Sequence, residues 1–310
     1  MKIAFVFPGQ GSQSVGMLNA WAGNLAVDSA MSEASAALGQ DLSALIATGP
    51  EHELNLTTNT QPVMLASAVA TYRAWLDAGG RQPDLVAGHS LGEYSALTAA
   101  GTFSLADAVR IVRVRADAMQ SAVPVGQGGM AAILGLDDDV VMQLCAQAAQ
   151  GDIVEAVNFN APAQVVIAGS KAAVERACEL AKEKGAKRAL LLPVSAPFHS
   201  SLLKPAAETL QQALQEVAMK TPVIPLINNV DVASPSEPAQ IRDALVRQAW
   251  HPVRWVQTIQ AMKAQGVTHI VECGPGKVLN GLTKRIDRDL IGLAITDPAS
   301  LQAALETLQG

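Results

Sequence analysis

Aromatic and charged side chains are both scarce in this sequence of 310 residues, at 4% and 16% respectively. Hydrophobic residues nonetheless make up 49% of the chain. That proportion excludes a disordered polypeptide and is typical of a globular protein with a large core. A chain of this length is expected to form two domains, or one large domain that carries an insertion.

Long apolar runs and cysteines are few as well. No uncharged apolar stretch reaches the roughly 18 residues that a membrane-spanning helix requires, and the N-terminal MKIAFVFPGQGSQ lacks the cleavage site of a signal peptide. Cysteine occurs only at Cys145, Cys178 and Cys273, so we expect buried free thiols in a reducing compartment rather than a disulfide framework. The sequence thus favours a cytoplasmic protein, and its formal charge of −6 argues against general nucleic-acid binding.

Strand-like and helical stretches alternate along most of the chain. We expect strands at 2–7, 85–88, 223–228, 267–273 and 290–295, and amphipathic helices at 61–78, 104–123, 201–218 and 241–250. This alternation predicts an α/β fold with a mostly parallel sheet.

One segment departs from this rhythm. It reads as a strand at 130–136, a helix at 138–149, strands at 153–158 and 164–168, a helix at 171–184 and a strand at 188–193. The order β-α-β-β-α-β is that of a ferredoxin-like unit. We therefore predict a small domain at 124–196, inserted into a large domain made of residues 1–123 and 197–310.

The stretch DLVAGHSLGEYSALTAAG (84–101) runs from an apolar strand into a helix through the pattern G-x-S-x-G. In a nucleophile elbow a strained turn exposes the serine hydroxyl, here that of Ser90, while Gly88 and Gly92 let strand and helix approach closely. The Leu91 amide then lies at a helix N-terminus, where it can stabilise an oxyanion. An ordinary glycine-rich turn with a helix-capping serine remains the alternative.

A serine nucleophile requires a base, and the sequence holds five histidines. His199, in the loop PVSAPFHSSL, is the best candidate because the chain returns there from the inserted domain to the main sheet. His89 adjoins the serine, but neighbours on a strand point to opposite faces. His251 is a weak candidate at a helix end, and His52 and His269 have no supporting motif.

No acidic residue is placed to complete a serine–histidine–acid triad. An α/β-hydrolase supplies its acid between the serine and the histidine, but the acids just before His199 fall on the inserted domain and none is placed to hold it: Glu155, Glu175, Glu179 and Glu183. We therefore favour a serine–histidine dyad oriented by a neutral group. Gln248 is a candidate, because it shares the apolar face of its helix and a buried amide needs a partner. A satisfied core glutamine remains the alternative.

The helix at 104–123 carries one arginine on its apolar stripe. Arg110 and Arg113 fall off the stripe and are expected to face solvent, whereas Arg115 lies within it, four residues before Met119. A guanidinium in that position needs an anionic or hydrogen-bonding partner. A structural salt bridge and a clamp for a substrate carboxylate are both open, since the fork geometry suits bidentate contact.

Six motifs occur in one order across essentially the whole chain: FPGQGSQ (7–13), GHSLGEYSAL (88–97), RADAMQ (115–120), NFNAPAQVVIAG (158–169), PFHSSL (198–203) and ECGPGKVL (272–279). Together they resemble the malonyl-CoA:acyl carrier protein transacylases. The resemblance implies a hydrolase-like α/β domain with a ferredoxin-like insertion. It also implies transfer of a malonyl group from malonyl-CoA to the phosphopantetheine thiol of acyl carrier protein, through a malonyl-serine intermediate, in fatty acid biosynthesis.

The resemblance further implies roles for individual residues. Ser90 would be the nucleophile and His199 its base, held through the backbone carbonyl of Gln248. The backbone amides of Gln10 and Leu91 would form the oxyanion hole. The residues expected at the substrate site are Arg115, which would bind the malonyl carboxylate, Met119, His89 and Phe198.

We expect no cofactor and no metal, because malonyl-CoA is a substrate and phosphopantetheine belongs to the partner protein. We also expect a monomer. Carrier proteins of this pathway are acidic, so local basic patches are predicted to dock them despite the negative net charge: Lys187, Arg188, Lys284 and Arg285. A thioesterase or esterase that releases free acid, a non-catalytic carrier-protein scaffold, and an acyltransferase of a polyketide pathway remain alternatives.

Overall fold

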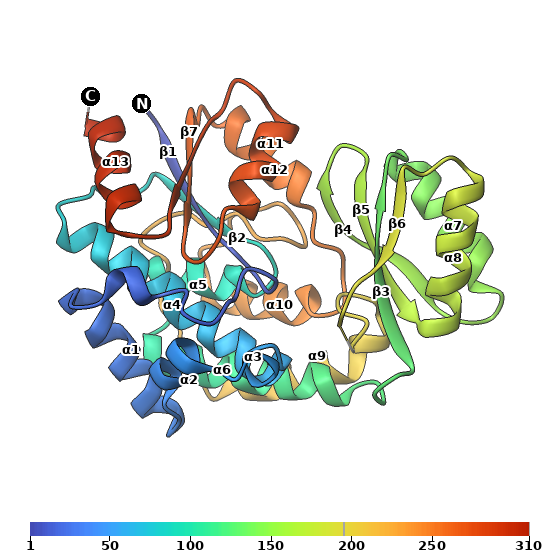
Figure 1. Ribbon diagram of the computed structural model, residues 1–310, viewed down its shortest axis with the longest axis horizontal. Coiled ribbons are helices and arrows are strands. Elements are labelled where there is room, and N and C mark those ends of the chain that lie inside the picture. The colour runs from blue at the N-terminus through green and yellow to red at the C-terminus, as the bar shows by residue number, and fades with distance from the viewer. Residues whose placement is uncertain (195, 310) are drawn as a thin grey trace.

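The computed structural model describes residues 1–194 and 196–309 (Figure 1). Its strands are β1 (Ile3–Phe7), β2 (Leu85–Gly88), β3 (Gly128–Leu134), β4 (Val154–Ala161), β5 (Gln164–Ser170), β6 (Arg188–Leu191), β7 (His269–Cys273) and β8 (Ile291–Ile295). Its α-helices are α1 (Leu25–Leu38), α2 (Leu42–Thr48), α3 (Glu51–Leu54), α4 (Thr57–Asp77), α5 (Gly92–Ala99), α6 (Leu105–Ser121), α7 (Asp138–Ala149), α8 (Lys171–Glu183), α9 (Lys204–Gln215), α10 (Pro238–Gln248), α11 (Trp255–Ala264), α12 (Val278–Ile286) and α13 (Pro298–Gln309). Short 3-10 helices are η1 (Asn19–Trp21) and η2 (Ser201–Leu203).

β1 lies inside a parallel sheet with the strand order β2-β1-β7-β8. Every β1 residue is buried, because helices cover both faces of the sheet. Phe5 and Phe7 pack into the core formed with α1, α4 and α6, whereas Ala4 and Val6 pack against α11 and α12 on the opposite face (Figure 1). Parallel strands end at a common edge, and the loops that follow β1 and β2 therefore lie together there.

A second sheet is antiparallel and has the order β4-β5-β3-β6. α7 and α8 pack on it, and together they enclose a separate hydrophobic core that includes Val141, Leu144 and Val174 (Figure 1). The predicted β-α-β-β-α-β order is confirmed, as is the α/β class with a parallel sheet. The division of the chain into domains at 124 and 196 stays a prediction.

The strand predicted at 223–228 is wrong. This segment runs beside β2, where the Val86 N–H donates to the Pro225 carbonyl and the Ile227 N–H donates to Val86, but only an isolated bridge to Leu226 forms. Pro222 and Pro225 have no N–H to donate, which prevents a regular ladder. The helix predicted at 201–218 likewise begins as η2 and becomes α9 only at Lys204.

One expectation about composition is met in the described residues. The cysteines are buried and free. In the same part of the chain, none of the helices has both the length and the apolar character needed to cross a membrane.

Candidate active site

Ser90 occupies the turn between β2 and α5, and its backbone is left-handed, with φ of 53°. This conformation is strained for a residue with a Cβ, and at a strand-to-helix turn it projects the side chain outward. The flanking glycines are required by packing: a Cβ on Gly88 would clash with the backbone of Gly92, and one on Gly92 would clash with the Phe7 carbonyl. The geometry predicted for an elbow is therefore present.

His199 lies in hydrogen-bond contact with the serine. The distance from Ser90 Oγ to His199 Nε2 is 2.6 Å, and His199 Nδ1 lies 2.8 Å from the backbone carbonyl oxygen of Gln248. A carbonyl only accepts, so Nδ1 carries the proton and Nε2 is free to accept the serine proton. The histidine is 3% exposed and also has a left-handed backbone, with φ of 64°.

The charge state of His199 follows from its surroundings. Burial, and after it the charge of the nearby Arg115 guanidinium, lowers the pKa of His199 from 6.5 to about 3. The imidazole is therefore neutral at physiological pH, as a general base must be.

Gln248 contacts His199 through its backbone and not through its side chain. The side-chain amide instead donates to the Ser90 carbonyl at 2.9 Å and to Glu93 Oε2 at 3.0 Å, while its oxygen accepts from Arg115 at 3.1 Å. The prediction that this buried amide needs partners is confirmed. The interpretation that its side chain orients the histidine is wrong, because the carbonyl makes that contact.

Arg115 is 2% exposed and its guanidinium faces the serine. One Nη donates to Gln61 Oε1 at 2.7 Å, and the other lies 3.1 Å from both Ser90 Oγ and Gln248 Oε1. The guanidinium carbon lies 5.4 Å from the ring centroid of Tyr94. Within the described residues no carboxylate forms a direct ion pair with Arg115, although the buried Glu93 carboxyl group acts on it through its charge.

The other arginines of α6 behave differently from each other. Arg110 is exposed, as predicted. Arg113 is half-buried and donates to Gln40 Oε1 at 2.5 Å. The expectation of a fully solvated Arg113 is therefore wrong, because the loop between α1 and α2 covers it.

A cavity of about 130 Å³ opens above the serine. Its lining residues are Gln10, His89, Ser90, Arg115, Met130, Asn158, Leu192, Val194, Phe198 and His199. Gln10 comes from the loop after β1, and Leu91 precedes the first turn of α5, so both belong to the same sheet edge as the serine. Met119 is absent from the described lining residues, and its sulfur instead contacts the Gln61 amide behind the site.

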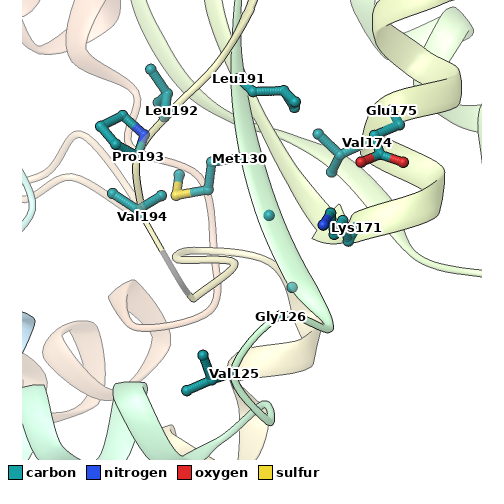
Figure 2. A pocket seen from close by; sticks show the side chains of 12 residues that line it. Val125, Gly126, Met130, Lys171, Val174, Glu175, Leu191, Leu192, Pro193 and Val194 are labelled. Carbon is teal, nitrogen blue, oxygen red and sulfur yellow. The ribbon is translucent and has the colours of Figure 1, made fainter.

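A wider cavity of about 400 Å³ adjoins the first and shares Met130, Leu192 and Val194 with it (Figure 2). It runs between β3, the segment after β6 and the start of α8. Val125 and Leu191 are exposed apolar side chains on its wall, and Lys171 and Glu175 stand at its α8 side. The two cavities together lead from the surface toward Ser90.

His89 is not positioned to act as the base, because its ring contacts Asn160. Its Nε2 lies 2.7 Å from Asn160 Oδ1, and its ring packs 5.4 Å from that of Trp255. Burial lowers its pKa below 6.5. The prediction that His89 is not the base to Ser90 agrees with this geometry, and its place on the cavity wall agrees with the expected substrate site.

Several polar residues of the site escaped sequence reasoning. The residues that the structure adds are Gln61, Glu93, Asn158, Asn160 and Asn229. Glu93 carried a signal, since it directly follows the elbow glycine on an apolar helix. Asn229 follows an apolar stretch, but nothing in its neighbourhood predicts contact with a serine 139 residues away.

The predicted basic patches lie at the surface. Lys187, Arg188, Lys284 and Arg285 are exposed. Arg285 donates to Gln164 Oε1 and to the Pro162 carbonyl, so it bridges α12 to the turn between β4 and β5. Within the described residues no group of His, Cys, Asp and Glu side chains could hold a metal ion.

The fold and the site together define a class of proteins: α/β proteins that present a serine–histidine pair at the edge of a parallel sheet, the arrangement used for acyl transfer. The chain belongs to the family of acyl transferase domains, which matches residues 4–288.

Close relatives share nearly the whole chain. The malonyl CoA-acyl carrier protein transacylase of Salmonella typhimurium is 55% identical over 305 residues, which cover 98% of this chain and 99% of that protein. The acyl-carrier-protein S-malonyltransferase of Burkholderia pseudomallei is 67% identical, with a TM-score of 0.98 over 99% of this chain and 100% of that one. A malonyl-transacylase solved in complex with its type II PKS acyl-carrier protein is 51% identical, with a TM-score of 0.98 over 99% of this chain and 100% of that one. The resemblance inferred from the motifs is confirmed.

Proposed function

We propose that this protein transfers the malonyl group of malonyl-CoA to the phosphopantetheine thiol of an acyl carrier protein, in fatty acid biosynthesis. The observation that carries the proposal is Arg115. Its buried guanidinium lies 3.1 Å from Ser90 Oγ, and no carboxylate among the described residues pairs with it. A carboxylate on the acyl group would accept from this guanidinium next to the serine, and the names of the relatives agree.

The first half-reaction forms the acyl-enzyme. His199 Nε2 takes the proton of Ser90, whose oxygen attacks the thioester carbon of malonyl-CoA. The new C–O bond forms, the C–S bond breaks, and the CoA thiolate takes the proton back from His199. The 2.6 Å contact between Oγ and Nε2 supports this pairing.

The tetrahedral intermediate carries a negative oxygen that needs donors. We assign this role to the backbone N–H groups of Leu91 and Gln10. Leu91 stands at the N-cap of α5, where the helix dipole favours negative charge. Gln10 faces the same cavity, and its side chain accepts from Gln61 at 3.1 Å, which holds its loop beside Arg115.

The second half-reaction transfers the acyl group to the partner. His199 deprotonates the phosphopantetheine thiol, the thiolate attacks the serine ester, and Ser90 regains its proton. Only proton and acyl transfers are involved, so the chemistry of these steps calls for no redox or metal cofactor. Because CoA must leave before the carrier thiol enters, the kinetics should be ping-pong.

Both substrates present the same pantetheine arm, and the wider cavity of Figure 2 is suited to it. Its walls are mostly apolar, and it joins the serine cavity through Met130, Leu192 and Val194. Arg188 begins β6 opposite Leu134, and Leu191, the last residue of the strand, lines this cavity, so the basic patch at Lys187 and Arg188 lies at the far end of the strand that leads to it. We propose this patch as the docking site of the acidic carrier protein. The monomeric state and the cytoplasmic location stay predictions.

Mass spectrometry of the intact protein tests the proposal. Incubation with malonyl-CoA should add one malonyl group, and subsequent addition of holo acyl carrier protein should remove it and load the carrier. Ser90→Ala should acquire no adduct. Malonate released to water without loading of the carrier would identify a hydrolase instead, and a malonyl adduct on Ser90→Ala would refute Ser90 as the nucleophile.

A further inference from the structure

We propose that Glu93 is a positioning residue that sets the geometry between nucleophile and base through one carboxylate oxygen. The inference rests on the proposed function only in taking Ser90 and His199 as that pair. Glu93 Oε2 accepts from two groups at once: the backbone N–H of Asn229 at 2.9 Å and the side-chain amide of Gln248 at 3.0 Å. One of these groups holds the serine and the other holds the histidine.

On the nucleophile side, Asn229 braces the strained turn. Its side-chain oxygen accepts from the Ser90 N–H at 2.7 Å, and its side-chain nitrogen donates to the Gly88 carbonyl at 2.7 Å. These bonds hold both ends of the turn that keeps Ser90 at φ of 53°. Such a conformation persists only where its surroundings over-determine it. The hydrogen bond from the Asn229 N–H to Glu93 in turn fixes the position of Asn229.

On the side of the base, Glu93 holds Gln248, which in turn holds His199. Its backbone carbonyl accepts from His199 Nδ1 at 2.8 Å and so sets the ring orientation. Its side-chain amide is anchored by Glu93 Oε2 and by the Ser90 carbonyl. Gln248 is the last residue of α10 and Glu93 lies in the first turn of α5. The carboxylate therefore links α5, which follows Ser90, to α10, whose last residue holds the ring of His199.

The environment of Glu93 argues against a passive role. The side chain is 1% exposed, and burial raises its pKa to about 7. A buried carboxyl group costs stability unless it is bonded, and an apolar residue would fill this site without that cost. Hydrogen bonds from Gln248 and Asn229 and the charge of Arg115 stabilise the ionised carboxylate and so oppose the effect of burial on its pKa.

Length and charge can be separated by two substitutions. Glu93→Gln keeps the chain length and an oxygen that can accept from both groups, but removes the charge. Glu93→Asp keeps the carboxylate but shortens the chain by one methylene, so one oxygen can no longer meet both donors. The matched control is Glu272, a buried carboxyl group on β7 whose pKa is also raised to about 7 and which accepts from the Asn280 N–H at 2.8 Å away from the reacting pair.

The test combines steady-state kinetics with labelling of the serine. A fluorophosphonate reacts with a base-activated serine by forming an O–P bond and expelling fluoride, while His199 takes the proton. This readout needs the Ser90–His199 pair but no malonyl group. Glu93→Asp should lower both kcat and the labelling rate by about tenfold or more, since misplacement by about 1 Å costs up to roughly a hundredfold. KM for malonyl-CoA should change less than about threefold, and Glu93→Gln should retain most of both rates.

Three results would overturn the proposal. The first is equal activity of Glu93→Asp and the unmodified protein. The second is a rise in KM for malonyl-CoA with unchanged kcat and a normal labelling rate, which would place Glu93 in substrate binding. The third is an equal loss in Glu272→Asp at matched thermal midpoints, which would make the effect one of general stability. If the unmodified protein is not labelled at Ser90, the proposed function fails instead, and the two failures are distinguishable.

Discussion

At the residue scale, Arg115 places a buried guanidinium beside the nucleophile, 3.1 Å from Ser90 Oγ. We predict that Arg115→Ala lowers kcat/KM for malonyl-CoA by roughly two to four orders of magnitude, because stranding one partner of a buried ion pair costs about 3–5 kcal/mol and about 1.4 kcal/mol corresponds to tenfold. Acetyl-CoA has no carboxylate to strand, so its transfer should fall far less. Both substrates are measured on one preparation.

Arg113→Ala supplies the control for this prediction. It lies on the same helix and donates to Gln40 without reaching the cavity, so its kinetics should stay close to those of the unmodified protein. Equal losses of malonyl and acetyl transfer in Arg115→Ala, or a drop in thermal midpoint large enough to account for them, would show that Arg115 is structural.

His199 determines the response of the site to acid. Its pKa is lowered to about 3, chiefly by burial and then by Arg115, so the base remains neutral well below the ordinary histidine value of 6.5. We predict that kcat/KM for malonyl-CoA, which reports the free enzyme, shows no acid limb at pH 6.5. A fall in kcat/KM centred near pH 6.5, over a range in which the thermal midpoint is constant, would contradict the assignment.

The same shift has a consequence for stability with a definite sign. As the pH falls below 6.5, His199 becomes protonated in the unfolded state, whereas in the folded state it stays neutral until about pH 3. The unfolded state therefore gains protons first, and the free energy of unfolding falls as pH decreases through that window. Comparison of His199→Gln with the unmodified protein by urea unfolding should show a smaller acid dependence in the variant. An identical dependence would contradict this prediction.

At the element scale, the loop that carries His199 is tied to β4. The Glu155 carboxylate accepts from the Ser201 N–H at 2.7 Å and from its hydroxyl at 2.9 Å. Glu155 was predicted not to hold His199, and it contacts the loop two residues beyond it. We predict a graded loss of kcat: Ser201→Ala removes one bond and should have the smaller effect, and Glu155→Ala removes both and should cost about tenfold.

The control for this loop is Glu179→Ala, which removes a carboxylate from α8 that pairs with Lys182 at the surface. Its kcat should be unchanged. A kcat of Glu155→Ala equal to that of Glu179→Ala would mean that the loop keeps its geometry without the tie to β4.

Elements with a local signal could be predicted, and those defined by distant contacts could not. The elbow between β2 and α5 and the order of the antiparallel sheet follow from periodicity and glycine spacing. The segment at 223–228 looked like a strand because its apolar pattern is regular, and prolines prevented the ladder. In the site, Ser90, His199 and Arg115 stood out by motif or by position. Glu93 had only its place after the elbow glycine to mark it, and the contacts of Glu93 and Asn229 could not be predicted because their partners lie far along the chain.

At the scale of the whole molecule, net negative charge makes the approach of an acidic carrier protein depend on local basic surface. We predict that the double reversal Lys187→Glu and Arg188→Glu raises the apparent KM for carrier protein by about threefold or more at low salt. The KM for malonyl-CoA should stay nearly constant. The loss should shrink as salt is added, because screening weakens the attraction.

Arg81→Glu is a control for the charge reversal, and it reverses one charge where the double variant reverses two. Arg81 is exposed and lies next to the start of β2 and β1, at the edge of the sheet opposite to the serine. Its reversal changes net charge without touching the cavity entrance. If both reversals raise the KM for carrier protein equally, overall charge governs the encounter; if neither does, the docking patch lies elsewhere.

The pairing of β1 with β7 also dictates when the protein can acquire its shape on the ribosome. Ile3 and His269 are register partners. β1, which is synthesised first, therefore cannot pair with β7 until most of the chain has been synthesised. At a synthesis rate of about 5–20 residues per second, that wait is on the order of 13–50 s. β3 to β6 pair with one another within residues 128–191, so the antiparallel sheet can form while the parallel one still lacks β7 and β8. During translation the apolar faces of β1 and β2 therefore depend on α4 to α6, or on a chaperone, for cover.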